Sequence, residues 1–479
     1  MPGDRRGDLG VGAMLGFAVG DYACNLYWQS VSIFLLFFYT DVVGLPAAVA
    51  GMIYMIASVF DGAIDPLMGV LADGTRTRSG RYRPYLLFGA VPLGASFVLL
   101  YYRPPLEGTG LIFFVLAVHI LFRVAYTAVS IPYTSLSARI TSSSDERSSL
   151  AGFRIMFATI AGFTVAMLTR PLAGMSVGPL AGFAVAALVF AVIATIILPA
   201  VFVAVREPPL EAEPPRLHLR QHWRAVRGNG AFWVLMIGIT MAVVCSTALG
   251  KSVLYYFKYY LHDEAGAQIA LSVNAAAGLL IIPVWVVATR WVGKRGAWFI
   301  ATAWGLAGLA FFAVTDIRSS AGMTGFLVYM QVAVLGIAMT FWSMLPDTVE
   351  YGEWRSGLRA ESVIFGLGQF FLKVALGLGA GLFGWALGHV GYVPNQPQTP
   401  ETLIGLKTIM IVLPALGVAA SGLVMWFYPM RKGDHSGIVR DIALKTAAAT
   451  AASSQATNSP EPGREPSPSW PIGERAYQR

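Results

Sequence analysis

The sequence predicts an all-α membrane protein with twelve transmembrane helices, arranged as two bundles of six. Three observations support this fold class. Of the 479 residues, 56% are hydrophobic and only 13% are charged, about half the charge of an ordinary soluble domain. Apolar runs of about 20 residues recur along the chain, and each can cross a ~30 Å hydrocarbon core as a helix. A polar, proline-rich stretch at 206–230 then divides these runs six and six.

The apolar runs are solid stretches and do not show the ten-residue alternation of a transmembrane barrel. The first run follows Arg5 and Arg6. It has no small-residue cleavage site and is too long for a signal peptide, so we expect a retained helix. The runs lie at 10–40, 47–72, 84–102, 109–138, 150–171, 178–205, 231–261, 266–289, 297–315, 323–349, 361–388 and 402–428.

Four parts of the chain follow from these runs. We expect an N-terminal bundle over 1–205, a cytoplasmic linker over 206–230 and a C-terminal bundle over 231–430. After Met430 the composition changes to Ala, Ser, Thr, Pro and charge. A segment of that composition has no core to bury, so 431–479 is expected to be a disordered cytoplasmic tail. Two such bundles are typical of the major facilitator architecture, whose halves rock about a site at mid-membrane.

The positive charge of the loops predicts the orientation. Eighteen Lys and Arg residues fall in loops on one side and three, Arg103, Arg170 and Arg318, on the other. Because positive loops stay inside, both termini are expected in the cytoplasm. The net charge of +8 thus reflects topology and not a nucleic-acid surface. The eighteen are Arg5, Arg6, Arg76, Arg78, Arg81, Arg83, Arg139, Arg147, Arg206, Arg216, Arg220, Arg224, Arg227, Arg290, Lys294, Arg295, Arg355 and Arg359.

Two carboxylates lie in the middle of the second run, where each costs roughly 2.5–3.5 kcal/mol to insert. Asp61 and Asp65 are four residues apart, so both lie on one helical face. Pro66 removes the hydrogen bond to the Gly62 carbonyl and frees an oxygen beside the acids. Two carboxylates and a carbonyl suit Na⁺ or a shared proton, and a structural ion pair with a neighbouring Arg or Lys is the alternative.

Other polar groups lie deep in apolar runs. Asp21 and Lys373 lie near mid-depth in helices that would line a central cavity, which favours a solute or coupling role. Lys251 could simply neutralise an acid, and Lys258, near a run end, can extend to the interface. Further candidates are Arg123, Arg154, His119 (a proton relay or a satisfied buried histidine) and Trp342 (a sugar platform or packing).

Enzymatic chemistry is not indicated. The sequence has no Walker-type phosphate loop, no His-Glu-x-x-His and no Cys-x-x-Cys, which disfavours an ATP-driven pump or a metalloprotease. Cys24 and Cys245 both lie in apolar runs, so neither a disulfide framework nor a cysteine metal site is supported. We expect no cofactor. Uphill transport would draw on a cation gradient.

Four separated motifs, in order, resemble the glycoside–pentoside–hexuronide:cation symporters, the family of the melibiose permease type within the major facilitator superfamily. The resemblance extends from about residue 10 to 430. The motifs are 38–45 (FYTDVVGL), 61–69 (DGAIDPLMG) continuing to 73–84 (DGTRTRSGRYRP), 131–136 (IPYTSL), and 346–353 (PDTVEYGE) followed by 359–362 (RAES).

The resemblance implies roles for individual residues. Asp61 and Asp65 match the cation-site acids, Thr127 matches a hydroxyl near that site, and Lys373 matches a lysine that links the bundles through these acids. The matches at the sugar site are Asp21, Arg154 and, beside Thr127, Tyr126. A cytoplasmic gate is expected in the motif loop at Asp73, Arg76, Arg78, Arg81 and Arg83, closed by charge-assisted hydrogen bonds.

Two positions depart from the melibiose permease pattern. Ser130 stands where an aspartate is shared by sugar and cation, and Thr134 stands where a tryptophan stacks on galactose. Losing the acid weakens a Na⁺ site that relied on three carboxylates and favours proton coupling. Ser130 is kept as a candidate residue of both the cation site and the solute site. Losing the aromatic ring argues against galactosides. With Arg154 and Lys373 less neutralised, a hexuronide is easier to accommodate.

The resulting hypothesis is a monomeric, multi-pass cytoplasmic-membrane symporter that moves a sugar, glycoside or hexuronide with H⁺ or Na⁺. A cation binds Asp61 and Asp65 and releases Lys373, and the halves then tilt about the occupied solute site. The alternative is a Na⁺-coupled carrier of lysophospholipid or another amphipath with the same fold. A non-transporting sensor is the third hypothesis, and the tail carries no motif that supports it.

Overall fold

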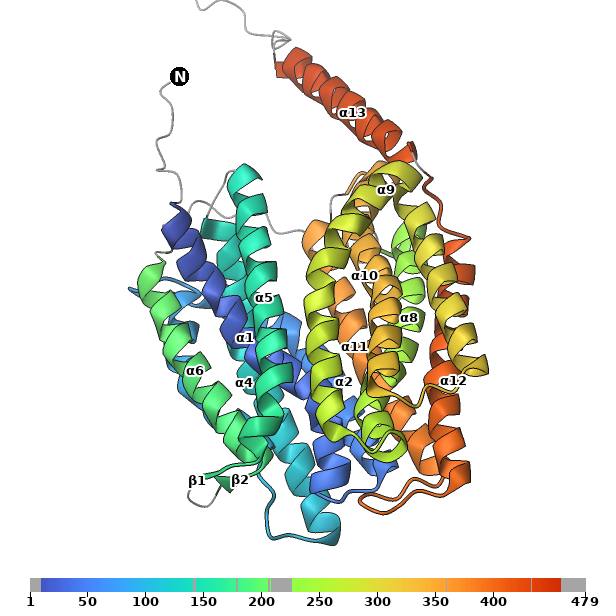
Figure 1. The fold of residues 1–479 in the computed structure, drawn as a ribbon. Coiled ribbons are helices and arrows are strands. Elements are labelled where there is room, and N and C mark those ends of the chain that lie inside the picture. The colour runs from blue at the N-terminus through green and yellow to red at the C-terminus, as the bar shows by residue number, and fades with distance from the viewer. Residues whose placement is uncertain are drawn as a thin grey trace, which may run out of the picture.

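The computed structural model describes residues 10–140, 144–177, 180–205, 207, 226–358, 360–431 and 433–457, and these are nearly all helical (Figure 1). The π-helical segments η1 (Phe38–Val42) and η2 (Tyr256–Tyr260) continue α1 and α8, and the strands β1 (Ser176–Val177) and β2 (Leu180–Ala181) form an antiparallel hairpin. The α-helices are α1 Val11–Phe37, α2 Ala47–Gly74, α3 Arg83–Leu100, α4 Gly108–Ile140, α5 Ser144–Ala173, α6 Phe183–Ala204, α8 Gly230–Tyr255, α9 Glu264–Val314, α10 Ser320–Ser356, α11 Glu361–His389, α12 Pro400–Met425 and α13 Asp434–Thr457.

Ten helices of the described chain, α2–α6 and α8–α12, are long and apolar enough to cross a membrane. The longest, α9, has 51 residues and is broken at Gly293, where φ is 76° and ψ is 162°. That left-handed backbone is open to glycine and costly for other residues. Gly293 separates the eighth and ninth apolar runs of the sequence, so α9 contains both runs.

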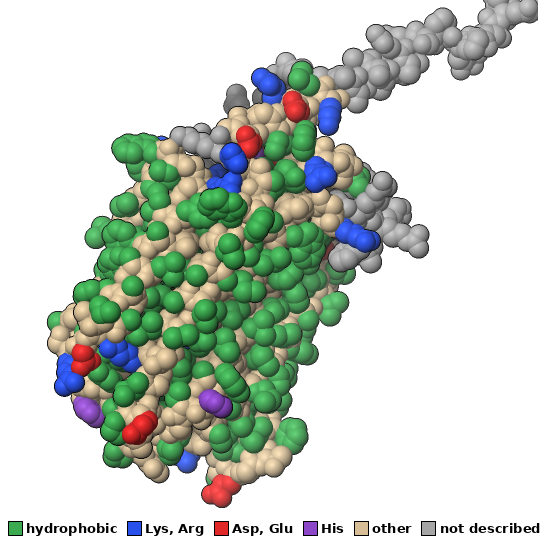
Figure 2. Space-filling view, turned by 90° about the vertical axis from the view of Figure 1, so that its right-hand side faces the viewer, with side chains coloured by type: hydrophobic (Ala, Val, Ile, Leu, Met, Phe, Trp, Pro, Cys, Tyr) green, Lys and Arg blue, Asp and Glu red, His purple; other side chains and the backbone are tan. Residues whose placement is uncertain are grey.

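The described chain exposes many large apolar side chains along its helices. Val203, Leu280 and Val314 are more than 75% exposed. Figure 2 shows hydrophobic side chains covering most of one face, with charged side chains gathered toward its two ends. Exposed apolar surface on this scale belongs against lipid.

Both ends of the molecule carry landmarks in Figure 1: α1 begins and α13 lies at one end, and β1 and β2 lie at the other. These are called the α13 end and the hairpin end. The expected disordered tail is wrong in part, because Asp434–Thr457 form α13. Its many alanines favour a helix without a core, and His435 contacts Glu350 of α10. Residues 458–479 and most of the 206–230 linker lie outside the described residues.

The described chain has an N-terminal half, α1–α6 (the N-half), and a C-terminal half, α8–α12 (the C-half). Helices α2 and α11 join these two halves at the hairpin end. A Cβ atom on Gly384 would lie 2.5 Å from the carbonyl oxygen of Ala47 and 2.8 Å from the Cα of Gly51, so only glycine permits this approach. Toward the α13 end the same helix α2 is uncovered, since Leu67 and Val70 are 68% and 74% exposed. The halves therefore meet at the hairpin end and part toward the α13 end.

A polar cluster also holds the hairpin end together. Asp41 of η1 accepts hydrogen bonds from Lys258 Nζ (2.6 Å) and Tyr259 Oη (2.5 Å) of η2, and from Tyr392 Oη (2.6 Å) after α11. Its backbone oxygen accepts from Asn395 Nδ2 at 2.6 Å. One N-half carboxylate thus binds three side chains of the C-half, and this cluster is called the Asp41 cluster.

Candidate functional site

Asp61 and Asp65 lie against Thr127 of α4 and Lys373 of α11. Lys373 Nζ lies 3.0 Å from Asp61 Oδ2 and 2.6 Å from Asp65 Oδ2. Thr127 Oγ1 is within hydrogen-bond distance of both acids, 2.7 Å from Asp61 and 3.1 Å from Asp65. Asp61 has a fully buried side chain, and 11% of the Asp65 side chain is exposed. The lysine therefore ties the C-half to two acids of the N-half.

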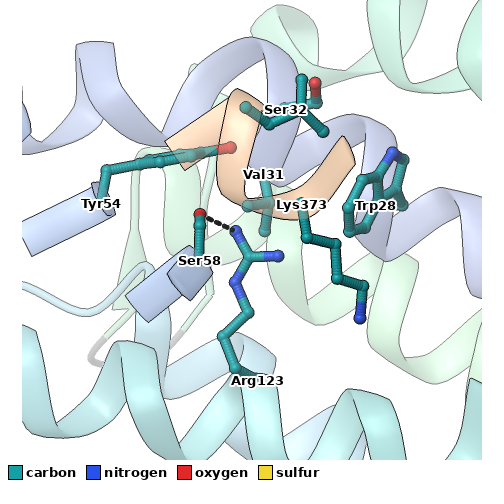
Figure 3. Close-up of a pocket in the computed structure, with 8 residues that line it drawn as sticks. Trp28, Val31, Ser32, Tyr54, Ser58, Arg123 and Lys373 are labelled. Carbon is teal, nitrogen blue, oxygen red and sulfur yellow. Dashed lines mark hydrogen bonds between the residues drawn. The ribbon is translucent and has the colours of Figure 1, made fainter. Parts of the chain in front are cut away.

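A second cation faces the same acids. Arg123 of α4, four residues before Thr127 and so on the same helical face, places Nη1 3.3 Å from Asp61 Oδ2. Its Nη2 donates to Ser58 Oγ at 3.3 Å, drawn as the dashed line in Figure 3, and its Nε donates to His119 Nε2 at 3.3 Å. Because His119 Nε2 accepts this bond, it carries no proton in this arrangement.

The cavity beside these cations is very small. It measures about 10 Å³, room for about one water. Figure 3 shows Arg123 and Lys373 projecting into the same space beside the Trp28 ring. The lining residues are Trp28, Val31, Ser32, Tyr54, Ser58, Arg123, Lys373 and Leu376.

A separate charge pair lies between α1 and α5. Arg154 Nε donates to Asp21 Oδ2 at 2.7 Å and Nη2 donates to Oδ1 at 3.2 Å, a bidentate arrangement. Tyr133 Oη donates to Asp21 Oδ2 at 2.6 Å, and its ring stacks on Phe17 with centroids 4.6 Å apart. The side chains of Asp21 and Arg154 remain 12% and 25% exposed, so a solute can reach them.

The other residues expected to bind cation or solute lie apart from the Asp61/Asp65 group and from the Asp21–Arg154 pair. Tyr126 stacks on Trp28 with ring centroids 5.8 Å apart. Ser130 is half-buried and Thr134 is exposed, and no hydrogen bond joins either hydroxyl to another described residue. Trp342, on α10 of the other half, is 42% exposed and touches the ring of Phe341.

The expected gate residues lie around the loop between α2 and α3. Tyr82 Oη donates to Asp73 at 2.6 Å, and Arg83 donates to the carbonyl of Phe202. Arg76 and Arg78 are exposed, with no ion pair to any described residue. The loop is anchored by Glu207, which accepts from the backbone N–H of Arg81 at 2.8 Å. Glu207 also accepts from the N–H of Tyr82 (3.0 Å) and pairs with Arg139 (3.0 Å).

Removing that anchor should destabilise the protein. The Glu207 side chain is only 3% exposed. Glu207→Ala removes the carboxylate that accepts hydrogen bonds from two backbone N–H groups and pairs with one guanidinium. We expect a loss of about 2–3 kcal/mol, measured as a lower unfolding temperature. The matched control is Glu264→Ala, which removes a 3.7 Å pair with Arg170 that is half exposed and should cost less than about 1 kcal/mol. Equal losses in the two variants would contradict the anchoring role.

Sequence reasoning missed several partners. It left Arg123 without a role and did not single out Asp41, Tyr133 or Glu207, although the first two of these three lie inside the quoted motifs. Lys258 does not merely extend to the interface, since it pairs with Asp41 at 2.6 Å. Lys251 neutralises no described acid: it donates to the carbonyl of Ser32 and lies 4.3 Å from the centre of the Tyr54 ring.

Comparison with known proteins identifies relatives that align over about nine-tenths of the chain. The putative glycoside/cation symporter YagG of Escherichia coli (strain K12) is 29% identical over 91% of this chain and 95% of its own length. The isoprimeverose transporter of Lactiplantibacillus pentosus is 30% identical over 87% of this chain and 88% of its own. Both agree with the resemblance to the glycoside–pentoside–hexuronide:cation symporters.

The fold matches solved transporters. The inward-facing, unoccupied structure of a bacterial homolog to the human lysosomal transporter Spinster aligns with a TM-score of 0.64 at 12% identity, over 87% of this chain and 97% of that one. A family model described as MFS/sugar transport protein matches residues 16–432. The chain is therefore a multi-pass membrane transporter and not an enzyme, and it belongs to the MFS/sugar transport protein family.

Proposed function

We propose that this chain is a symporter that couples the entry of a sugar, glycoside or hexuronide to H⁺ or Na⁺ by alternating access. The observation that carries the proposal is Lys373, a C-half lysine that pairs with both N-half acids, Asp61 and Asp65. An ion pair across the moving interface gives a cation a way to control the motion. The names of the two relatives support the solute class.

The coupling step follows from charge. A cation that binds at Asp61 and Asp65 removes the attraction that holds Lys373 and frees the halves to move. A state in which Lys373 has left and no cation has arrived would leave two buried acids facing Arg123 alone. One buried negative charge would then be unbalanced, which is costly. Movement of the empty, lysine-free protein is thereby suppressed. Thr127 supplies a neutral oxygen to this cation site. Ser130, three residues further along α4, is proposed to supply a second one when a cation is bound.

The solute site is proposed around Asp21 and Arg154. The Asp21 carboxylate accepts hydrogen bonds and the Arg154 guanidinium donates them. A sugar hydroxyl both donates and accepts, so it suits this pair. Arg154 also suits the carboxylate of a hexuronide. Tyr126, Ser130 and Thr134 of α4 would line this site from the N-half, and Trp342 and Lys373 would approach it from the C-half when the halves close.

We also propose the finer topology. Twelve spans result when α1 is counted and α9 is divided at Gly293. The α13 end then faces the cytoplasm, together with both termini, because the positively charged loops lie there. Asp73, Arg76, Arg78, Arg81 and Arg83 are proposed to close this end when it meets the C-half. A monomer contains both halves and needs no second copy.

One observation favours the amphipath alternative. A cavity of about 300 Å³ lies between α1, α5, α8 and α9 toward the hairpin end. Phe34, Phe37 and Phe183 give it an apolar wall. Arg170, Lys258 and Glu264 are its charged residues, with Arg170 paired to Glu264 and Lys258 to Asp41, so an anionic headgroup would compete with these acids for the two cations. An acyl chain with an anionic headgroup would find complementary groups there.

The test is thermal unfolding of the purified protein with neutral glycosides, pentosides, hexuronides and lysolipids, each in Na⁺ and in K⁺ and at two pH values. A ligand at about 100 times its Kd stabilises by about 2.7 kcal/mol. A shift with one sugar class, strengthened by Na⁺ or by a pH change, is expected. A shift with lysolipid alone would replace the sugar assignment by the amphipath alternative.

A further inference from the structure

Arg123 brings a fixed positive charge into the proposed cation site. Its side chain is buried, and Nη1 lies 3.3 Å from Asp61 Oδ2, the same oxygen that Lys373 Nζ approaches to 3.0 Å. Two acids and two basic side chains thus form a balanced group. An arginine keeps its proton in any protein environment. The positive charge of Arg123 therefore cannot be removed by deprotonation.

Among the described residues, the hydrogen-bond and ring partners of Arg123 belong to the N-half. Ser58 of α2 and His119 of α4 accept its hydrogen bonds. The rings of Trp28 (α1) and Tyr54 (α2) each lie 5.6 Å from its guanidinium carbon. Lys373, in contrast, comes from the C-half and moves with it. When the halves rearrange, Lys373 can leave Asp61 and Arg123 stays.

We propose that Arg123 takes the position at Asp61 that a bound sodium ion would need, so that Na⁺ is not the coupling ion of this transporter. This inference rests on the proposed function and deepens it. With Lys373 withdrawn, Asp61, Asp65 and Arg123 leave one net negative charge. A Na⁺ ion binding Asp61 would meet the guanidinium at the same oxygen.

Room is the second obstacle to sodium. Na⁺ is coordinated by several oxygens at once, as other hard cations are. In the described chain, with Lys373 in place, the free cavity beside Arg123 measures about 10 Å³; hydroxyl-bearing residues Ser32, Tyr54 and Ser58 line it, and neither acid does. Removing the arginine side chain both enlarges this cavity and restores the second negative charge.

The test measures ion binding without any solute. The unfolding temperature of the purified protein is compared in NaCl, KCl and choline chloride at equal ionic strength. Wild type should respond equally to all three salts. Arg123→Ala should gain a saturable, Na⁺-specific rise in unfolding temperature that wild type lacks.

Matched variants make each outcome decisive. Arg123→Lys keeps the charge and should stay insensitive to Na⁺, as should Arg318→Ala, which removes a surface arginine whose side chain is 81% exposed. The Na⁺ response of Arg123→Ala should vanish when Asp61→Asn is added. If Arg123→Ala does not fold, Arg123→Gln takes its place.

Two results would overturn the inference: a Na⁺-specific rise in wild type that Asp61→Asn abolishes, or a folded Arg123→Ala or Arg123→Gln without any Na⁺ response. Neither result touches the solute assignment, which the glycoside panel tests. Absence of a shift with every sugar would count against the proposed function and leave the ion measurements interpretable.

Discussion

Asp61→Asn should nearly abolish gradient-driven uptake while leaving solute binding intact. The substitution removes the charge that Arg123 and Lys373 share, and breaking a buried ion pair costs about 3–5 kcal/mol. If that energy is lost from the coupling step, uptake falls on the order of 10²- to 10³-fold. Solute binding should persist because Asp21 and Arg154 form a separate pair. Uptake into proteoliposomes and ligand-induced thermal shifts measure the two properties.

A second substitution that restores the net charge of the site is the control for this variant. Asp61→Asn leaves one uncompensated positive charge, so the protein should also lose stability. Adding Arg123→Gln restores the balance, and the double variant should regain stability but not coupled uptake. Asp316→Asn, which removes a surface carboxylate 41% exposed, should behave as wild type. Coupled uptake in the double variant would show that coupling does not depend on Asp61.

The sequence was sufficient to predict the apolar helices and the ionisable residues that lie inside them. Asp61, Asp65, Thr127 and Lys373 do meet, although α2 and α11 are about 300 residues apart in sequence. Helical spacing placed the two acids on one face. The free-energy cost of an ionisable side chain inside the membrane indicated that each such residue has a specific role. Family motifs then supplied the pairing that periodicity alone cannot give.

The roles of Arg123 and Asp41 could not be predicted from the sequence, and the reason is the same for both. Arg123 and Asp41 acquire their importance only from contacts between segments far apart in the chain, and no local pattern records such contacts. Asp41 lies 217 residues from Lys258 and 351 from Tyr392. The helix α13 was missed for a different reason, since its composition indicated the lack of a core while its alanines carried helix propensity.

The Asp41 cluster gives the second large effect. Asp41→Ala should shift the protein away from the conformation closed at the hairpin end. One buried carboxylate there holds Lys258, Tyr259 and Tyr392 of the C-half. Hydrogen bonds to a charged group contribute about 1.5–3 kcal/mol each. Losing even about 4 kcal/mol of this sum changes the ratio of closed to open forms on the order of 10³-fold.

Spin labels can measure this shift as a distance. One label replaces Arg103, after α3, and the other replaces Ala321, at the start of α10, both exposed residues at the hairpin end of different halves. In Asp41→Ala the distance between the labels should lengthen. Asp263→Ala removes another acid at this end, but one that caps α9 and accepts from Ser320 within its own half, so the distance should stay short. If both variants keep the short distance, the remaining cross-half contacts at this end hold it closed without help from Asp41. These include the glycine contact of α2 with α11, the Thr40–Tyr255 hydrogen bond and the Arg170–Glu264 pair.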